Sequence, residues 1–512
     1  MGKVVRKRAL TTRYVSPNQL VLEGFKTPFD QQLTRANRWV KLSEAIPWDS
    51  IVSLYEAQFK STEGRPPING RVILGAVIIK HMLDLTDRET VSQLTENMFM
   101  QYFLGYAGFT NEEPFSPSLF TEIRERLTLN LMNAINEIIV AHSLLTDKES
   151  PPKERPKNKN KGTEETVAAP KESPTPPSAQ EPTAHKGKLI MDATAAPQNI
   201  TYPTDTKVLN AAREKSEELI DKLWDKQLHG PVKVRTYREI ARKDFLHIAQ
   251  KKSKSSQAIY KANGSLLRYL KRNLGHIKQL LESYAAAGEK IPWRKKDYNY
   301  HEVIEKVYEQ QEHMHSHRIH QVENRIVNIH QAHVRPIVRG KEGKKVEFGS
   351  KQQTSLVDGF TFLDRLSWDN FNEGTYLRES VEKYKRRFGH YPQQVLADKI
   401  YCTQENRRFL KEKKIVLRAK PLGRPPSVKA VEHHVSPGER NPIEGKFGQA
   451  KMAYGLGCIR AKLKTTSESW IASIILVLNL KNLMRRALPW LLFLRYYFQV
   501  WLSCPREFMS KP

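Results

Sequence analysis

One segment of the chain, residues 148–187, most constrains how the protein can fold. It contains eight of the 29 prolines and no aromatic residue, and Lys and Glu alternate there with Ser and Thr. A segment of this composition cannot bury enough apolar surface to form a core, so we predict a flexible linker. The linker divides the 512-residue chain into residues 1–147 and residues 188–490, which are followed by an apolar and basic tail, residues 491–512.

The part that precedes the linker shows helical signals. Leu74, Ile78 and Met82 repeat at a spacing of four residues, which lays one apolar stripe along a helix. Thr86 and Glu89 have the pattern of a capping box, which predicts that a second helix begins there. We therefore expect an all-α N-terminal domain. Its basic residues fit a helix-turn-helix that binds DNA, and a domain that serves only for packing fits the pattern equally well.

The charge of the chain points to a polyanionic partner. The formal net charge is +29 at pH 7, which favours nucleic acid. The density of cations is highest between Lys233 and Lys278, a stretch that contains 13 Lys or Arg residues and only two acidic residues. We interpret this stretch as a basic helical surface that follows phosphates, with a solvated charged face as the alternative.

Other features exclude several classes of protein. The three cysteines, Cys402, Cys458 and Cys504, are odd in number and far apart, so they predict neither a disulfide framework nor a zinc knuckle. The apolar C-terminal stretch is interrupted by charged residues such as Lys481 and Arg485 before a membrane span accumulates. Because no secretory signal is visible either, we expect a cytoplasmic protein without membrane contact.

Strand and helix signals alternate after the linker. The apolar run 188–192 predicts a buried strand, and residues from about 207 to 334 are mostly helical. Residues 345–350 and 354–363 predict two strands that pair as a hairpin, and residues 394–398 predict a further strand. This order indicates an α/β sheet core that is interrupted by a helical insertion.

Two of these predicted strands end in a carboxylate, Asp192 and Asp398. If the strands are neighbours, the two side chains emerge side by side at one end of the sheet. Carboxylate oxygens are the ligands that Mg²⁺ prefers, and few are needed because the ion keeps several waters and binds phosphates.

A third group of charged residues follows near the C-terminus. Arg440, Glu444 and Lys451 are spaced by four and seven residues, which places them along one face of a helix. Asn441 and Pro442 predict the N-cap and first position of that helix. A carboxylate between two cations can complete a metal site while the cations bind phosphates.

Other carboxylates could replace members of this trio. Asp205 could act in place of Asp192, and Glu432 or Glu439 in place of Glu444. We discount them because Asp205 lies in a turn-like context and Glu439, five residues before Glu444, points elsewhere on a helix.

Three histidines, His313, His317 and His320, are spaced by four and three residues on a predicted helix. This spacing can bind a transition metal, but a polar helix face explains it without one.

The motifs that contain the trio resemble a known family. Ala397-Asp-Lys-Ile-Tyr401 and Arg440-Asn-Pro-Ile-Glu444-Gly-Lys-Phe-Gly-Gln-Ala-Lys451, with Asp192 upstream, resemble the DDE transposases of bacterial insertion sequences, which have an RNase H-like catalytic core. Gly64-Arg-Pro-Pro and Val334-Arg-Pro-Ile-Val-Arg-Gly-Lys341 are similar to the subgroup related to the fourth- and fifth-numbered families. One departure is Pro437, where the related signature often has Tyr.

The resemblance implies a transposase that binds the terminal inverted repeats of its element and catalyses metal-dependent cleavage and strand transfer. Asp192, Asp398 and Glu444 would hold two Mg²⁺ or Mn²⁺ ions. The partners would be double-stranded DNA, at the element ends and at the target, and a second copy of the chain in a homodimer or larger assembly on DNA. The protein would associate with the bacterial nucleoid in the cytoplasm. The residues expected to contact DNA are Arg440, Lys451, Arg335, Arg339 and Lys341.

Two other functions stay open. An inactive or domesticated DNA-binding protein would keep the fold and the basic surface without turnover. An RNase H-like nuclease would share the metal site and cut DNA without joining it.

Overall fold

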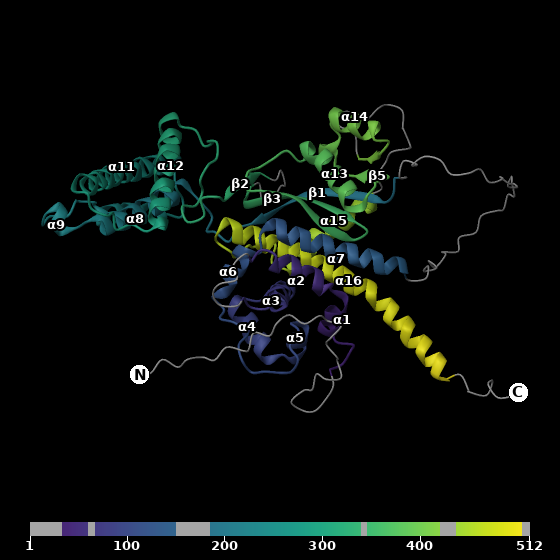
Figure 1. The fold of residues 1–512 in the computed structure, drawn as a ribbon. Coiled ribbons are helices and arrows are strands. Elements are labelled where there is room, and N and C mark those ends of the chain that lie inside the picture. Colours follow the sequence, from purple (N-terminus) through teal and green to yellow (C-terminus); the bar gives the residue numbers. More distant parts are fainter. Residues whose placement is uncertain (1–32, 60–66, 150–184, 339–345, 420–436, 504–512) are drawn as a thin grey trace, which may run out of the picture.

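The computed structural model describes residues 33–59, 67–149, 185–338, 346–419 and 437–503 (Figure 1). Most of the predicted linker lies outside the described residues, so its flexibility stays a prediction. Within the described residues, helices and a curled mixed sheet form an α/β structure.

Helices are the regular elements of the described residues 33–59 and 67–149. The capping box predicted at Thr86 and Glu89 is confirmed. Thr86 Oγ1 accepts a hydrogen bond from the Glu89 amide, and Glu89 Oε2 accepts one from the Thr86 amide. The helices are α1 (Arg38–Ala45), α2 (Trp48–Glu56), α3 (Gly70–Met82), α4 (Asp87–Glu96), α5 (Met98–Phe103), α6 (Leu119–Arg126) and α7 (Leu129–Glu149).

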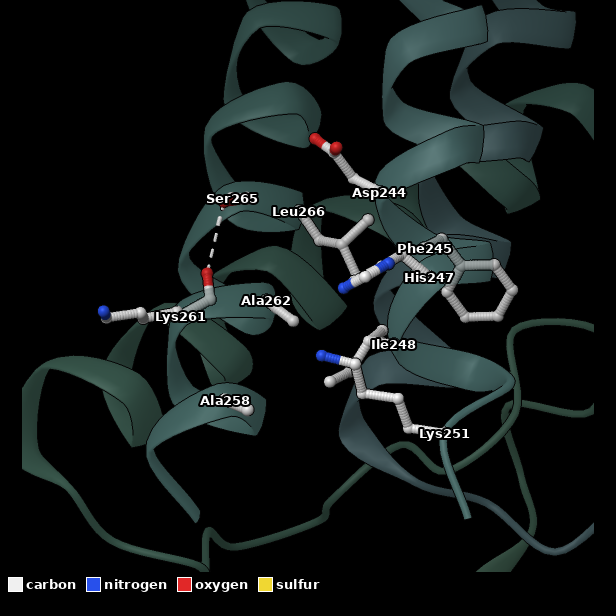
Figure 2. Close-up of a pocket in the computed structure, with 10 residues that line it drawn as sticks. All are labelled: Asp244, Phe245, His247, Ile248, Lys251, Ala258, Lys261, Ala262, Ser265 and Leu266. Atoms are coloured by element: carbon white, nitrogen blue, oxygen red, sulfur yellow. Dashed lines mark hydrogen bonds between the residues drawn. The ribbon is translucent and has the colours of Figure 1, made fainter. Parts of the chain in front are cut away.

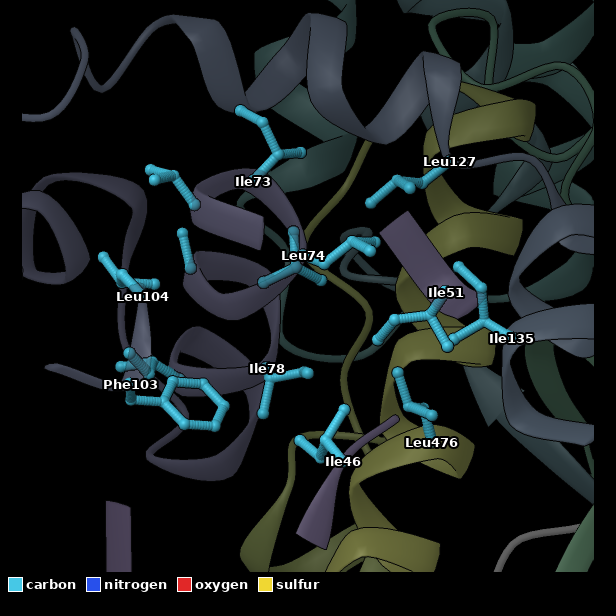
Figure 3. Close-up of a cluster of buried hydrophobic side chains, with 14 of the residues drawn as sticks. Ile46, Ile51, Ile73, Leu74, Ile78, Phe103, Leu104, Leu127, Ile135 and Leu476 are labelled. Carbon is cyan, nitrogen blue, oxygen red and sulfur yellow. The ribbon is translucent and has the colours of Figure 1, made fainter. Parts of the chain in front are cut away.

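These helices share their core with the last helix of the chain, α16 (Lys464–Ser503) (Figure 3). Leu476 and Leu480 of α16 lie in the same buried cluster as Ile73 and Phe103. Other positions of α16, such as Ile474, belong to the cluster beneath the sheet. The helix runs through Pro489 to Ser503, so the tail predicted from residue 491 begins inside it.

The sheet has six strands in the order β2-β3-β1-β5-β6, with β4 paired to β3. β1 and β3 are antiparallel, as are β3 and its other partners, whereas β1, β5 and β6 are parallel. The strands are β1 (Lys188–Pro197), β2 (Arg335–Val338), β3 (Val346–Val357), β4 (Phe360–Ser367), β5 (Gln394–Leu396) and β6 (Val416–Arg418).

The hairpin predicted from residues 345–350 and 354–363 is wrong. Residues 346–357 form one strand, β3, and the hairpin joins β3 to β4 through Asp358 and Gly359, which both have positive φ. Gln352 and Gln353, which lie between the two predicted strands, are fully buried within β3.

Helices cover both faces of the sheet. Leu189 and Met191 of β1 pack with residues of α13 and α14 on one face, and Ala196 packs with residues of α15 and α16 on the other. These helices are α13 (Leu377–Phe388), α14 (Gln404–Glu412) and α15 (Pro437–Ala453).

A helical lobe is inserted between β1 and β2 and projects away from the sheet (Figure 1). Its buried apolar cluster contains residues from Val208 to Ile329 and takes none from the sheet or from α16. Helices therefore occur where the sequence predicts a helical insertion. They are α8 (Asp205–Leu223), α9 (Lys226–His229), α10 (Arg238–Ala249), α11 (Ser256–Ala287) and α12 (Lys295–His317).

Candidate active site

Asp192 and Asp398 come together because their strands are parallel neighbours. Ile190 of β1 is paired with Leu396 of β5, so the same register continued by two residues brings Asp192 beside Asp398. In both strands the side chains alternate between faces. Leu189, Met191 and Val395 face the α13 side, which directs the two aspartates to the face that α15 covers.

The prediction that Asp192 ends its strand is wrong. β1 continues to Pro197, and Asp192 is paired with Thr354 of β3 on its other side. Residues 193–196 continue the strand and are mostly buried, and Ala196 packs with residues of α15 and α16. Asp192 is therefore held by strand partners on both sides, and its Oδ1 accepts a hydrogen bond from the Ala193 amide at 2.8 Å.

Asp398 does lie at a strand end, as predicted. Its Oδ1 accepts the Lys399 amide at 2.7 Å and so caps a short 3-10 helix, Lys399–Tyr401. Tyr401 anchors this turn, because its ring is fully buried and its hydroxyl donates to Gln353 of β3 at 2.9 Å. The Asp-Lys-Ile-Tyr motif thus places the carboxylate by burying the tyrosine three residues later.

Arg440 links the third element to the aspartates. Its guanidinium lies 3.1 Å from Asp398 Oδ1 and 2.9 Å from Glu444 Oε1. Asn441 and Pro442 do not begin the helix, which is a correction to the prediction. α15 starts at Pro437, and Pro442 lies inside it near its N-terminus, where few main-chain hydrogen bonds are lost.

The electrostatics of the four groups are coupled. Burial raises the pKa of Asp192 to about 6, and the neighbouring Glu373 and Asp398 carboxylates add to the rise, against the Ala193 amide and the Arg440 charge. Burial lowers the pKa of Arg440, but the Glu444 hydrogen bond and the charges of Asp192 and Asp398 outweigh it and leave that pKa raised. The site therefore has an excess of carboxylates, to which Arg440 is the nearest counter-charge.

The chemistry of this donor set fits a hard divalent cation, since all candidate ligands are carboxylate oxygens. The positions of the side chains are less complete. In the described part of the chain, no three His, Cys, Asp or Glu side chains converge closely enough to surround a metal ion. Glu444 is half exposed and is paired with Arg440, so it does not point at Asp192 and Asp398 together.

Two of the three alternative carboxylates form ion pairs away from Asp192 and Glu444. Asp205, in the first turn of α8, pairs with Arg325 of the lobe and accepts a hydrogen bond from Gln311. Glu439 pairs with Arg418 at the end of β6, at 3.3 Å. Glu432 lies outside the described residues.

The other predicted DNA contacts are placed only in part. Lys451 lies in the last turn of α15, seven residues after Glu444 and on the same helix face. Arg335 is half-buried, donates to the main-chain oxygens of Ala332 and Val334, and lies 3.6 Å from Asp369. Arg339 and Lys341 lie outside the described residues.

Sequence reasoning missed Glu373, which contributes to the potential at Asp192. It opens a short 3-10 helix, Glu373–Tyr376, and pairs with Lys351 of β3 at 2.9 Å. Asn406 ties this turn to the Asp398 turn by donating to the main-chain oxygens of Gly374 and Tyr401. A loop carboxylate outside any periodic pattern gives no sequence signal of this role.

The histidine spacing does not produce a cluster. His313 and His317 lie on α12 with their rings 4.3 Å apart, but the helix ends at His317 and Arg318 adopts a left-handed conformation. His320 is therefore not on the same helix face.

Two known protein families match separate parts of the chain. Residues 27–126 match a family described as a transposase domain, DUF772, and residues 395–481 match a family described as a transposase DDE domain. The second match contains Asp398, Arg440, Glu444 and Lys451, whereas Asp192 lies outside both.

One curated relative is an uncharacterized protein, ORF8 of the nfe locus, from Rhizobium meliloti. It is 30% identical over 103 residues, which is 20% of this chain and 49% of that protein, so the match spans about half the relative's length. No solved structure matches the chain. Among the described residues, no helix has both the length and the apolarity to cross a membrane.

Proposed function

We propose that this chain, which its two matched domains identify as a DDE-type transposase of an insertion sequence, cuts double-stranded DNA at the ends of its element and joins them to target DNA. The observation that supports this most is the strand register, which places Asp192 of β1 beside Asp398 of β5. Arg440 then ties Asp398 to Glu444 of α15.

The proposed catalytic core is RNase H-like. Its support is the sheet, in which three antiparallel strands, β4, β3 and β1, continue into the parallel strands β5 and β6. The first aspartate on the central strand and the second after its parallel neighbour suit such a core. The third carboxylate comes from a helix packed on that face.

Asp192, Asp398 and Glu444 are the residues that would hold divalent cations, Mg²⁺ or Mn²⁺, in a two-ion site. Bound there, the ions would supply activation of the attacking oxygen and stabilisation of the leaving oxygen in an in-line displacement at phosphorus. For Glu444 to join the aspartates, its ion pair with Arg440 must break.

The chain's own residues supply positioning and charge. The strand partners of Asp192 and the buried Tyr401 fix the two aspartates before DNA arrives. Arg440, released from Glu444, can form charge-assisted hydrogen bonds to a phosphate beside the cleaved bond. Lys451 lies on the same face of α15 and can bind a second phosphate.

The natural substrate is proposed to be the terminal inverted repeats, with a homodimer or larger assembly bringing two ends together. An inactive DNA-binding protein and a nuclease without strand transfer are the two rival functions, and one experiment separates all three.

The experiment incubates the full chain with a duplex that carries the element's own ends, a target plasmid and Mg²⁺ or Mn²⁺. We expect cleavage at the end and joining of its 3′-hydroxyl to the target. Asp398→Asn should bind the duplex equally and leave it intact, whereas the matched control Asp205→Asn should cut like the unaltered chain. Cutting without joining would support the nuclease, and binding without cutting by every protein would support the inactive form.

A further inference from the structure

The helical lobe carries a group of cations that the candidate active site does not use. Of the 13 Lys and Arg residues between Lys233 and Lys278, twelve are exposed. In the described part of the chain, the ion pairs formed by this group are those of Lys233 and Arg238 with Asp221. Most of these charges are therefore not neutralised within the protein.

Three of the cations form a stripe along α11. Lys261, Arg268 and Arg272 are separated by seven and four residues, so they lie on one side of the helix, opposite buried residues such as Leu270 and Ile277. At 1.5 Å per residue the stripe is about 17 Å long. Phosphates on one DNA strand repeat about every 3.4 Å along the axis, so the length of the stripe spans about five phosphates.

Aromatic rings hold part of this stripe in place. The guanidinium of Arg272 lies 4.5 Å from the centre of the Tyr237 ring, and that of Arg235 lies 4.8 Å from the same ring. Stacking on a ring orients a guanidinium without neutralising its charge. The two arginines are therefore positioned before a ligand binds.

A cavity of 310 Å³ opens beside the stripe, between α10 and α11 (Figure 2). Figure 2 shows Lys251 and His247 extending toward α11 into this space, while Lys261 points away from it. Phe245 and Leu266 contribute apolar lining. The surface thus combines a row of cations on α11 with a neighbouring cavity that has apolar lining and into which Lys251 and His247 extend.

The start of α11 lies at the end of the lobe that is joined to the sheet. Thr206, in the first turn of α8, donates to Asn263 of α11 at 2.8 Å. Tyr260 of α11 stacks on His315, near the end of α12, with ring centres 4.0 Å apart. α8 follows β1 and α12 precedes β2, so these contacts tie the start of α11 to the two connections between the lobe and the sheet.

Gly275 extends the stripe, since it lies fourteen residues after Lys261. No atom lies within 4 Å of the position that a Cβ would occupy there, so packing within the chain does not require glycine. Helix interiors disfavour glycine, which is used where a backbone must be approached closely. A ligand whose surface approaches the α11 backbone closely would account for glycine at position 275.

We propose that the stripe of Lys261, Arg268 and Arg272, together with Lys251, binds the phosphate backbone of duplex DNA at a site separate from the catalytic carboxylates. The choice of DNA rests on the proposed function, and the charge, spacing and exposure of the stripe supply the rest. The contact is independent of base sequence, because cations on phosphates do not read bases.

The test measures how salt weakens the binding of the full chain to a labelled duplex, without divalent metal so that cleavage does not interfere. The stripe variant combines Lys261→Gln, Arg268→Gln and Arg272→Gln. Each lost phosphate contact lowers the slope of log affinity against log salt by about 0.9, so we expect a fall of about 2.7. Between about 50 and about 200 mM salt, the unaltered chain should then lose about 40-fold more affinity than the variant.

The matched control removes three exposed lysines at the other end of the lobe, through Lys290→Gln, Lys295→Gln and Lys296→Gln. Its slope should stay near that of the unaltered chain. Equal slopes for the stripe variant and the unaltered chain would overturn the proposal, as would an equal loss in the control. A loss confined to an RNA duplex would also overturn it.

A second variant, which should remain folded, tests the same surface independently. Gly275→Gln adds a side chain in open space, so its thermal unfolding midpoint should equal or exceed that of the unaltered chain, while its DNA affinity falls several-fold. Unchanged affinity in a folded Gly275→Gln protein would count against close approach of DNA to α11. Failure of the proposed function would appear in the cleavage assay, as an unaltered chain that binds DNA without cutting it. The salt-dependence test does not depend on cleavage, because Asp398→Asn should bind DNA with the same slope as the unaltered chain.

Discussion

The N-terminal helices and the inserted lobe are both helical, yet they are joined to the sheet in opposite ways. The lobe is continuous in sequence with β1 and β2 but buries its apolar residues in a cluster of its own. The N-terminal helices are separated from β1 by residues 150–184 but share a cluster with α16, whose remaining positions pack beneath the sheet.

Polar groups strengthen the second connection. Asn479 of α16 is fully buried, donates to Asn136 of α7 and accepts the amide of Thr361 of β4. Arg387 of α13 binds both Glu137 of α7 and Asp364 of β4. We therefore expect the N-terminal helices and the sheet to unfold as one cooperative unit and the lobe to unfold separately.

The largest expected effect comes from separating the regions. Residues 198–334, which contain the lobe and its cluster, should form a helical fragment that melts cooperatively, as followed by circular dichroism. Residues 33–149 alone should lack a cooperative transition, because the surface that Leu476 and Leu480 cover is then exposed. Cooperative melting of residues 33–149 alone would contradict a core that depends on α16.

The next largest effect concerns Arg387, whose side chain is 7% exposed beside Asp364 at 1%. Arg387→Ala leaves a buried carboxylate without its partner, so the free energy of unfolding should fall by about 3–5 kcal/mol in chemical denaturation. The control Arg126→Ala removes an exposed pair with Glu122 and should cost less than about 1 kcal/mol. Similar losses in the two variants would show that the link between α7 and the sheet is not a strong one.

A cavity made in each of the two cores should destabilise a different set of helices and strands. Leu476→Ala and Leu270→Ala each remove a buried leucine and should each cost about 2–5 kcal/mol. Hydrogen exchange should then rise in both α3 and β4 for the α16 variant, but only within α8–α12 for the lobe variant. Faster exchange throughout the chain in Leu270→Ala would contradict a separate lobe.

The smallest expected effect concerns two helix N-caps, one in the N-terminal helices and one in the lobe. Thr86 caps α4 and Ser255 caps α11, where its hydroxyl accepts the Ala258 amide at 3.2 Å. Each change to Ala should cost about 1 kcal/mol. Thr86→Ala should shift the unfolding of the N-terminal helices and sheet together, and Ser255→Ala should shift the lobe transition alone, as separate calorimetric peaks would report.

Local signals explain what the sequence could predict. The capping box at Thr86, the helices of the lobe and the strand before Asp398 depend on residues close in sequence, so their patterns are readable. The pairing of Asp398 with Asp192 was expected only if their strands were neighbours, and the parallel register of β1 and β5 fulfils that condition.

Features that depend on long-range packing could not be predicted. β1 continues beyond Asp192 through small residues, of which Ala196 packs with residues of α15 and α16, and β3 runs through two glutamines that are fully buried. The role of α16 in two clusters and the approach of Glu373 to Asp192 arise only when distant segments meet. The start of α15 was misplaced because Pro442 is tolerated inside its N-terminal part.

We predict that Asp192, Asp398 and Glu444 together bind divalent cations on the α15 face of the sheet. The most direct measurement is Mn²⁺ binding to the full chain by calorimetry, repeated with Asp398→Asn and Asp205→Asn. We predict that Asp205→Asn binds like the unaltered chain and that Asp398→Asn binds at least about tenfold more weakly, because even loss of an outer-shell partner of a metal ligand typically costs about tenfold or more in affinity. Equal binding by Asp398→Asn and the unaltered chain would contradict the claim.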